Sequence, residues 1–244
     1  MLEPRTLRRG AVLGVFLFFG FVLQTVGLVT TTPARSAFIT GLYVVLVPVV
    51  GWLVFRRRAR FTSWVGVGLA AVGLRYLTGA DVGVAQGLST GDVLTLGCAV
   101  AYTFHILFTE RYAPRTGVVA LGAVQLWMVA GLSALCVPVA GARVTWTPAF
   151  LGAVAFCGLL ASALSICVQT WAQARTTAVR VAIICCLEPV FTAVYSVALD
   201  YEQLGAREWA GGALIVLGVL VAELGGHLLE RWREARTVPP GRGP

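Results

Sequence analysis

The chain contains no lysine and no asparagine, and only 12% of its 244 residues are charged. Soluble domains carry about 25% charged residues, so an ordinary soluble globular fold is excluded. Hydrophobic residues make up 58% of the chain, and its mean hydropathy is +0.83. The few charges stand in short groups between long uncharged stretches, a pattern typical of an all-α, polytopic transmembrane helix bundle.

The sequence also lacks the motifs of several enzyme classes. It has neither a phosphate-binding Walker loop nor an H-E-x-x-H zinc helix. Its six cysteines lie inside apolar stretches without the spacing of a zinc site or a disulfide framework. We therefore expect no metal, no cofactor and no enzymatic activity. An intramembrane enzyme is a minor alternative, since Glu188 is the only acid expected at the middle of the bilayer.

Eight segments are each long enough to cross a hydrocarbon core of about 30 Å. Their predicted bounds are 10–29, 34–55, 61–78, 92–109, 118–139, 148–169, 178–199 and 207–228.

The arginines give this bundle an orientation. With eight spans, 15 of the 19 arginines fall on the side of the two termini, and Arg35, Arg75, Arg143 and Arg207 fall on the other. Basic residues concentrate on the cytoplasmic side of membrane proteins. We therefore expect an integral protein of the cytoplasmic membrane with both termini in the cytoplasm. The net charge of +8 then indicates contact with lipid headgroups rather than with nucleic acid.

The first three spans recur as the last three, 145 residues further along the chain. "TTPARSA" from Thr31 matches "TTAVRVA" from Thr176, and "WVGVGLAAVG" from Trp64 matches "WAGGALIVLG" from Trp209. "LVPVV" matches "LEPVF" with a slip of about one helical turn, which pairs Glu188 with Val47. Because equivalent spans are five crossings apart, the two copies lie in opposite orientations, as in many secondary transporters.

The repeat divides the chain into an incomplete first unit, 10–78, a five-span second unit, 92–228, and a cytoplasmic tail, 229–244. Two spans precede the second copy of the repeat, whereas nine residues precede the first. We therefore interpret the chain as a ten-span architecture without its first two helices.

Four stretches carry a resemblance to a known family: "LQTVGLVTTTPARSAFITGLYVVLVPVV", "STGDVLTLGCAVAYTFHILFTERYAP", "VQTWAQARTTAVRVAIICCLEPVF" and "GGALIVLGVL". They are similar to EamA-type permeases of the drug/metabolite transporter superfamily. The resemblance covers about residues 10–228. It implies two inverted five-helix repeats and cytoplasmic termini, and many such permeases export small metabolites, amino acids or drugs.

Within "RVAIICCLEPVF", Glu188 stands at the middle of the seventh predicted span and Pro189 follows it. An ionised side chain there costs about 2.5–3.5 kcal/mol, so the neutral acid is favoured. Pro189 frees the carbonyl group near Cys185 and predicts a kink, as does Pro48 in the second span. Glu188 either binds an amino group or a proton in a central cavity, or it satisfies the freed carbonyl group and stabilises the kink.

The remaining candidate residues are polar groups inside spans. His105 either relays protons or makes a neutral contact between helices. Gln24 and Gln169 occupy equivalent places in the repeats and either line a cavity or join helices by hydrogen bonds. Tyr43, Tyr102 and Gln125 are weaker candidates for the lining of a cavity.

The sequence thus predicts a secondary transporter for a small-molecule solute in a lipid bilayer, with proton coupling as an option. A truncated subunit, or one that needs a partner for transport, is the alternative. A homodimer is also left open.

Overall fold

The computed structural model describes residues 3–31, 33–56, 59–78, 89–140, 145–200 and 204–237. Within these ranges every regular element is a helix. The helices are α1 (Pro4–Gly27), α2 (Pro33–Gly41), α3 (Tyr43–Phe55), α4 (Phe61–Thr78), α5 (Thr90–Tyr112), η2 (Ala113–Arg115), α6 (Val118–Ala140), α7 (Pro148–Phe156), η3 (Cys157–Leu164), α8 (Ser165–Gln173), α9 (Ala178–Cys185), α10 (Glu188–Ala198) and α11 (Ala206–Thr237).

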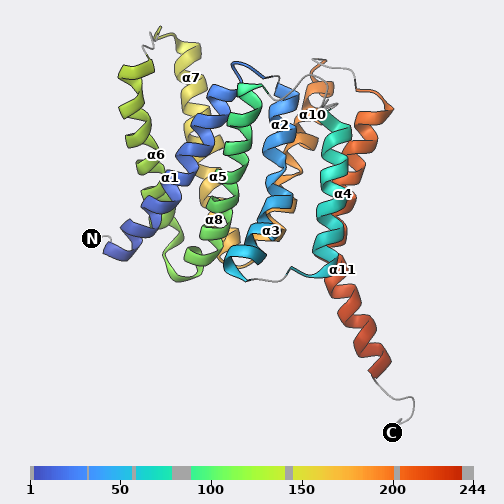
Figure 1. Ribbon diagram of the computed structural model, residues 1–244. Helices are drawn as coiled ribbons and strands as arrows, with labels where there is room; N and C mark the ends of the chain where they lie inside the picture. The colour runs from blue at the N-terminus through green and yellow to red at the C-terminus, as the bar shows by residue number, and fades with distance from the viewer. Residues whose placement is uncertain are drawn as a thin grey trace.

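The described helices form eight antiparallel passes (Figure 1). Three passes are composite: α2 continues into α3, α7 continues through η3 into α8, and α9 continues into α10. Both termini lie at the same end of the bundle, the end at which α1 begins (Figure 1). We call it the terminal end. Five passes among the described residues are long and apolar enough to cross a membrane by these criteria alone. The prediction of a polytopic all-α membrane bundle is confirmed.

The third pass has the predicted bounds, 61–78, whereas others extend beyond them at the terminal end of the bundle. α1 begins at Pro4, six residues before the predicted span, and α5 continues to Tyr112. Arginines in these extra turns have long side chains that reach the membrane surface while their backbone stays helical. Hydropathy alone therefore predicted these two helices to be shorter at the terminal end of the bundle than they are.

Two composite passes are interrupted at equivalent positions. Leu42 separates α2 from α3, and its amide N–H bonds to the Ile39 carbonyl oxygen at 3.2 Å. In the other repeat, the Leu187 amide bonds to the Ile184 carbonyl oxygen at 2.9 Å, immediately before α10. Both are i→i−3 bonds, which tighten one turn and redirect the helix.

The two predicted kink prolines lie differently with respect to these interruptions. Pro189 stands in the first turn of α10, where the missing amide hydrogen removes no helical bond. Pro48 lies inside α3, six residues after the interruption at Leu42. The second pass is therefore interrupted at Leu42, whereas α3 continues through Pro48, which lacks only its own backbone donor.

α4 and α11 are the most closely packed pair of helices, and four glycines allow the approach. A Cβ on Gly66 would lie 2.7 Å from the Gly218 carbonyl oxygen, and a Cβ on Gly73 would lie 2.6 Å from the Gly211 carbonyl oxygen. Gly66 and Gly73 are the repeat equivalents of Gly211 and Gly218. Each glycine thus meets the equivalent of the other, which is the pattern of contacts around a two-fold axis.

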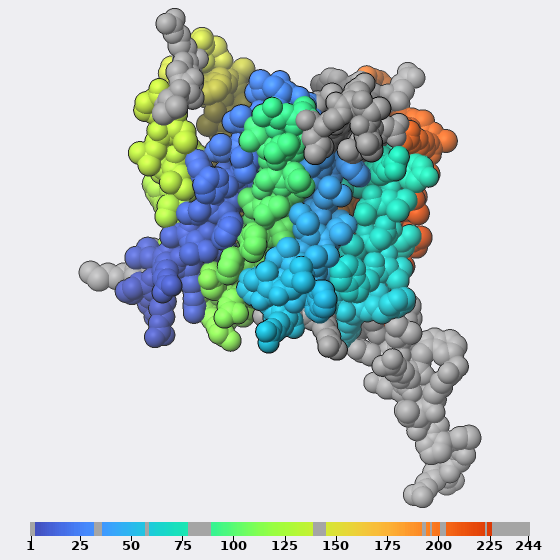
Figure 2. Space-filling model, viewed as in Figure 1, coloured from blue at the N-terminus to red at the C-terminus, as the bar shows by residue number. Residues whose placement is uncertain are grey.

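α5 occupies the centre of the bundle. On the face seen in Figure 2, it lies between α1 and the pass formed by α2 and α3. Phe16 of α1 stacks on Phe104 and Phe108 of α5, with both ring-centroid separations at 5.5 Å. Gly20 of α1 leaves room for the Tyr102 ring. These contacts hold the polar side chains of α5 against the neighbouring passes.

α7 and η3 stand apart from this packing. Neither element has a buried residue, and a Cβ added at Gly152 or Gly158 would meet no atom within 4 Å. Gly10 of α1, Gly66 of α4 and Gly218 of α11, by contrast, adjoin neighbouring helices. One face of the sixth pass is therefore open to lipid or to another helix.

Candidate functional site

Glu188 is the first residue of α10, directly after the interruption of its pass. Its side chain lies within electrostatic range of the hydroxyl groups of Tyr43 on α3 and Tyr102 on α5. Glu188 is exposed, whereas Tyr43 is buried. A carboxyl group and two phenol groups from three different passes therefore lie within electrostatic range of one another.

Thiols adjoin the same group. The Tyr43 hydroxyl lies within hydrogen-bonding reach of the Cys185 thiol, and Cys186 also neighbours Glu188. We call Tyr43, Tyr102, Cys185, Cys186 and Glu188 the central polar cluster. Its members can exchange hydrogen-bond partners with a solute or with a protonated carboxyl group.

Gln24 extends the polar groups towards α1. Its amide nitrogen donates to the Thr40 hydroxyl of α2 at 3.2 Å, and the Cys98 thiol of α5 is within hydrogen-bonding reach of the same hydroxyl. Gln24 therefore joins two passes by a hydrogen bond, as one of its two predicted roles requires.

His105 and Gln125 form a second polar group, buried between α5 and α6. The Nε2 atom of His105 lies 2.8 Å from Gln125 Oε1, and Gln125 Nε2 donates to the Thr170 hydroxyl of α8 at 3.3 Å. His105 is 1% exposed and Gln125 is 0% exposed. These bonds connect the passes of α5, α6 and α8 and give His105 a fully buried partner.

Gln169 and Gln173 lie on α8, next to this network. Gln169 Nε2 donates to Gln173 Oε1 at 3.3 Å, and Gln173 Nε2 donates to the Ile106 carbonyl oxygen at 2.9 Å. The two repeat-equivalent glutamines thus have different environments: Gln24 bonds to another pass, whereas Gln169 bonds within its own helix.

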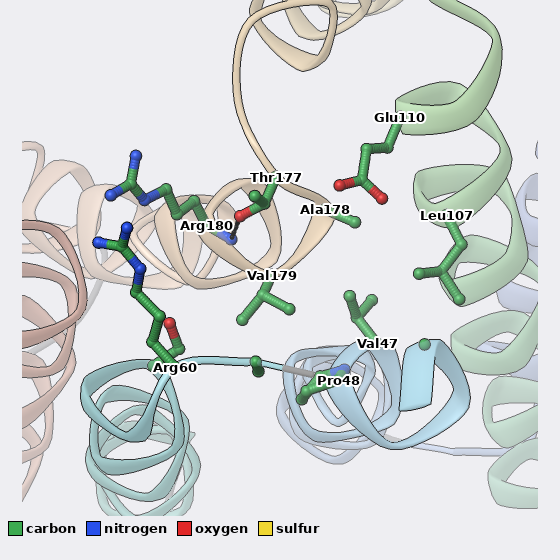
Figure 3. Close-up of a pocket in the computed structure, with 12 residues that line it drawn as sticks. Val47, Pro48, Arg60, Leu107, Glu110, Thr177, Ala178, Val179 and Arg180 are labelled. Carbon is green, nitrogen blue, oxygen red and sulfur yellow. Dashed lines mark hydrogen bonds between the residues drawn. The ribbon is translucent and has the colours of Figure 1, made fainter. Parts of the chain in front are cut away.

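A cavity of about 470 Å³ opens at the terminal end of the bundle. Its lining comes from α3, from the segment that leads into α4, from α5 and from the start of α9 (Figure 3). The lining residues are Val47, Pro48, Gly51, Ala59, Arg60, Ser63, Leu107, Glu110, Thr177, Ala178, Val179 and Arg180.

An apolar layer neighbours this cavity and the central polar cluster. Val47, Leu107 and Ala178 belong both to the cavity lining and to one core cluster. That core cluster also includes Tyr43, with Tyr102 packed against it. The cavity and the central polar cluster therefore adjoin the same packed residues, so a shift of α3 or α9 would alter both.

The charged residues of the cavity were not among the predicted site residues. Glu110 stands in the last turns of α5, while Arg60 and Arg180 stand at the starts of α4 and α9. In the sequence these arginines serve only to orient the bundle. One signal in the sequence could have found them. Glu110 stands at the end of the fourth predicted span, on the same side of the membrane as Arg60 and Arg180 at the starts of two other spans.

A comparison with protein-family models finds that residues 2–79 and 89–224 match the EamA-like transporter family. The chain belongs to the EamA-like transporter family. An uncharacterized transporter from Archaeoglobus fulgidus is 31% identical over 215 residues, which span 88% of this chain and 68% of that protein. The chain is therefore a membrane transporter, and its resemblance to EamA-type permeases of the drug/metabolite transporter superfamily is confirmed.

A solved crystal structure has the same fold. It superposes with a TM-score of 0.76 over 93% of this chain and 87% of its own, at 20% sequence identity. At that identity the likeness shows only the fold of this chain and gives no information about its solute.

Proposed function

We propose that this chain is a secondary transporter that moves a small metabolite or drug across the cytoplasmic membrane by alternating access, with both termini in the cytoplasm. The cavity carries this proposal. It lies between α3 and α4 of the first repeat unit and α5 and α9 of the second. Relative motion of two inverted units would open such a cavity first to one side and then to the other.

The central polar cluster supports a proton-coupled mechanism. Alignment of the two helix interruptions, at Leu42 and Leu187, pairs Tyr43 with Glu188, which also lies 145 residues further along the chain. The sequence motif pairs Glu188 with Val47 instead, and the pairing with Tyr43 is part of this proposal. Equivalent residues that lie near each other must lie near the axis relating the units. In inverted-repeat carriers the coupling site is found there.

Glu188 would accept a proton from one side of the membrane and release it to the other. The neutral form is favoured inside the bundle, and the ionised form is favoured when water or a cationic group reaches the site. Tyr43, Tyr102, Cys185 and Cys186 are the titratable groups around it. Solute and proton would thus compete for one carboxyl group, which couples their movements.

Flux measurements in proteoliposomes test this function. The unaltered protein should accumulate or expel solute in response to an imposed pH gradient. The Glu188→Gln variant should lose this dependence while remaining folded. Glu208→Gln is a matched control, because Glu208 accepts a hydrogen bond from the Gly205 amide at the start of α11, outside the cluster. Unchanged pH dependence in Glu188→Gln would remove Glu188 from the mechanism.

The open face of α7 and η3 favours a second candidate, transport only in an assembly. No residue of these two elements is buried, so a further copy or another helical subunit would find an uncovered surface there. Native mass spectrometry from lipid nanodiscs, combined with flux at different protein-to-lipid ratios, distinguishes the two. A monomer with full flux would eliminate the need for an assembly.

A further inference from the structure

A separate cavity, of about 290 Å³, lies at the start of α1. Arg5, Arg8, Arg9 and Val12 line it from α1, and Tyr112 lines it from the last turn of α5. We call it the arginine cavity. It shares no lining residue with the larger cavity between the two repeat units. Three of its five lining residues are cationic and none is acidic, so it is suited to an anion.

One of the three arginines is held in place. Arg9 Nη1 donates hydrogen bonds to the Arg115 carbonyl oxygen at 3.0 Å and to the Thr116 hydroxyl at 2.9 Å. Its guanidinium carbon also lies 5.7 Å from the centre of the Tyr112 ring. These three partners are uncharged, so they restrain the guanidinium group without neutralising it. Arg9 therefore presents a fixed positive charge where α1 meets the end of α5.

The other two arginines lie on one face of α1. Arg5 and Arg8 are three residues apart, and Arg9 follows Arg5 by four, so their side chains are neighbours on the helix surface. Arg5 and Arg8 are exposed, and neither side chain forms a hydrogen bond or an ion pair within the described part of the chain. Like charges at these spacings repel one another. An anion between them would remove that repulsion.

Apolar residues continue the same face of α1 away from the terminal end. The residues that follow Arg8 at alternating spacings of four and three are Val12, Val15, Phe19 and Val22. The three valines are partly exposed, and Phe19 is 48% exposed. This face thus combines cationic groups at the end of the bundle with an apolar surface along the membrane-spanning part. A phospholipid has the complementary parts, an anionic headgroup and apolar chains.

We propose that the arginine cavity binds the phosphate group of an anionic phospholipid, whose acyl chains lie along the apolar face of α1. Guanidinium groups bind phosphate oxygens through paired hydrogen bonds, and the Tyr112 hydroxyl group is a further donor. A headgroup with net negative charge is preferred, since no acidic residue lines the cavity to hold an ammonium group. The bound lipid connects α1 to α5, whatever solute the protein moves.

Native mass spectrometry of the full chain in detergent measures the binding of single lipids. The probes are phosphatidylglycerol, phosphatidylcholine with the same acyl chains, and glycerol 3-phosphate, which has no acyl chains. Phosphatidylglycerol should bind at least about tenfold more tightly than either of the others, which corresponds to about 1.4 kcal/mol. Equal affinity for the two lipids would overturn the proposal. Glycerol 3-phosphate binding as tightly as phosphatidylglycerol would show a site for soluble phosphates and would overturn it as well.

Substitutions of Arg8 locate the lipid. Arg8→Gln should weaken the binding of phosphatidylglycerol about tenfold, and Arg8→Lys should weaken it less, because lysine keeps the charge but not the planar set of donors. Arg175→Gln is the matched control, since Arg175 is also exposed, stacks on Trp171 at 4.4 Å and does not line the arginine cavity. Equal losses in Arg8→Gln and Arg175→Gln would show diffuse attraction to anionic lipid and contradict the site.

Thermal unfolding separates lipid binding from folding. Without lipid, Arg8→Gln should have the midpoint of the unaltered protein, because the Arg8 side chain makes no bond within the described fold. Added phosphatidylglycerol should raise the midpoint of the unaltered protein, as a ligand of the folded state does, and should raise that of Arg8→Gln less. Tyr112→Phe removes only a hydroxyl group and should also weaken binding. Unaltered lipid affinity in both variants, with midpoints preserved, would refute the proposal.

Discussion

Leu42 and Leu187 interrupt their passes at the same place in the two repeats, 145 residues apart. At each, an amide bonds to the carbonyl oxygen three residues earlier, that of Ile39 or Ile184. The sequences around them differ, since a proline follows Leu187 by two residues and Leu42 by six. A shared backbone break with different local sequences indicates that the architecture, and not the proline alone, determines where the passes bend.

The packing of α4 on α11 predicts a contrast between two glycines of one helix. Gly66→Ala places a methyl group 2.7 Å from the Gly218 carbonyl oxygen, whereas a methyl group at Gly68 meets no atom within 4 Å. Overpacking should lower the free energy of unfolding of Gly66→Ala by about 1–3 kcal/mol. Gly68→Ala should be neutral or slightly stabilising, because alanine favours helix.

Thermal unfolding of the two variants in the same detergent measures this contrast. Identical midpoints would mean that α4 and α11 do not approach closely at Gly66.

The buried bond between His105 and Gln125 predicts a non-additive pair of substitutions. Gln125→Leu leaves the His105 ring without its partner, which costs about 1–3 kcal/mol. The double variant His105→Leu/Gln125→Leu removes both polar groups and should recover part of that loss. A double-mutant cycle from unfolding in denaturant measures the coupling, and strictly additive effects would refute the contact.

The same network allows a test of the proton-relay hypothesis for His105. His105→Gln retains a side chain that can hydrogen-bond to Gln125 but cannot take up a proton near neutral pH. We expect it to retain solute flux with unchanged pH dependence, because the buried Nε2 atom of His105 already has Gln125 as a hydrogen-bond partner. Loss of pH-driven flux in this variant, with its thermal midpoint preserved, would instead establish a relay.

Asp92 predicts a stability effect at the opposite end of the bundle. Its carboxylate accepts bonds from the Thr31 hydroxyl at 2.6 Å and from the Ser89 amide at 2.9 Å, completing the capping box of α5. Asp92→Ala should lower the free energy of unfolding by about 2 kcal/mol, because it loses a cap and a charged hydrogen bond. Asp92→Asn keeps one acceptor oxygen and should lose less. Equal stability of the two variants would exclude this role.

Much of the fold was predictable because it follows from the bilayer. Long apolar segments gave the number of passes, and the glycines that repeat from Gly66 to Gly211 indicated which helices are equivalent. The interruption at Leu42 was not predictable, since the glycine that precedes it in "ITGLYVV" is also common inside uninterrupted transmembrane helices. It depends on how α2 and α3 pack against α5.

The candidate site was predictable only in part. Glu188 and Tyr43 stand out as polar residues within apolar segments, so the sequence identified them separately. That Glu188 and Tyr43 are neighbours depends on tertiary packing. The matching prolines of the two repeats pair Glu188 with Val47 instead, one helical turn from Tyr43. Glu110 and Arg180 lie at the ends of spans, where charges are ordinary, and only the tertiary arrangement brings them to one cavity.

The antiparallel arrangement of the two repeats is the central claim, and one pair of residues tests it directly. Phe61 and Ala206 begin α4 and α11, are repeat equivalents, and are both exposed. In a variant with its six cysteines replaced, Phe61→Cys and Ala206→Cys are each treated with a membrane-impermeant maleimide from either side. The account predicts labelling of Phe61→Cys only from the cytoplasmic side and of Ala206→Cys only from the opposite side. Labelling of both from the same side would contradict it.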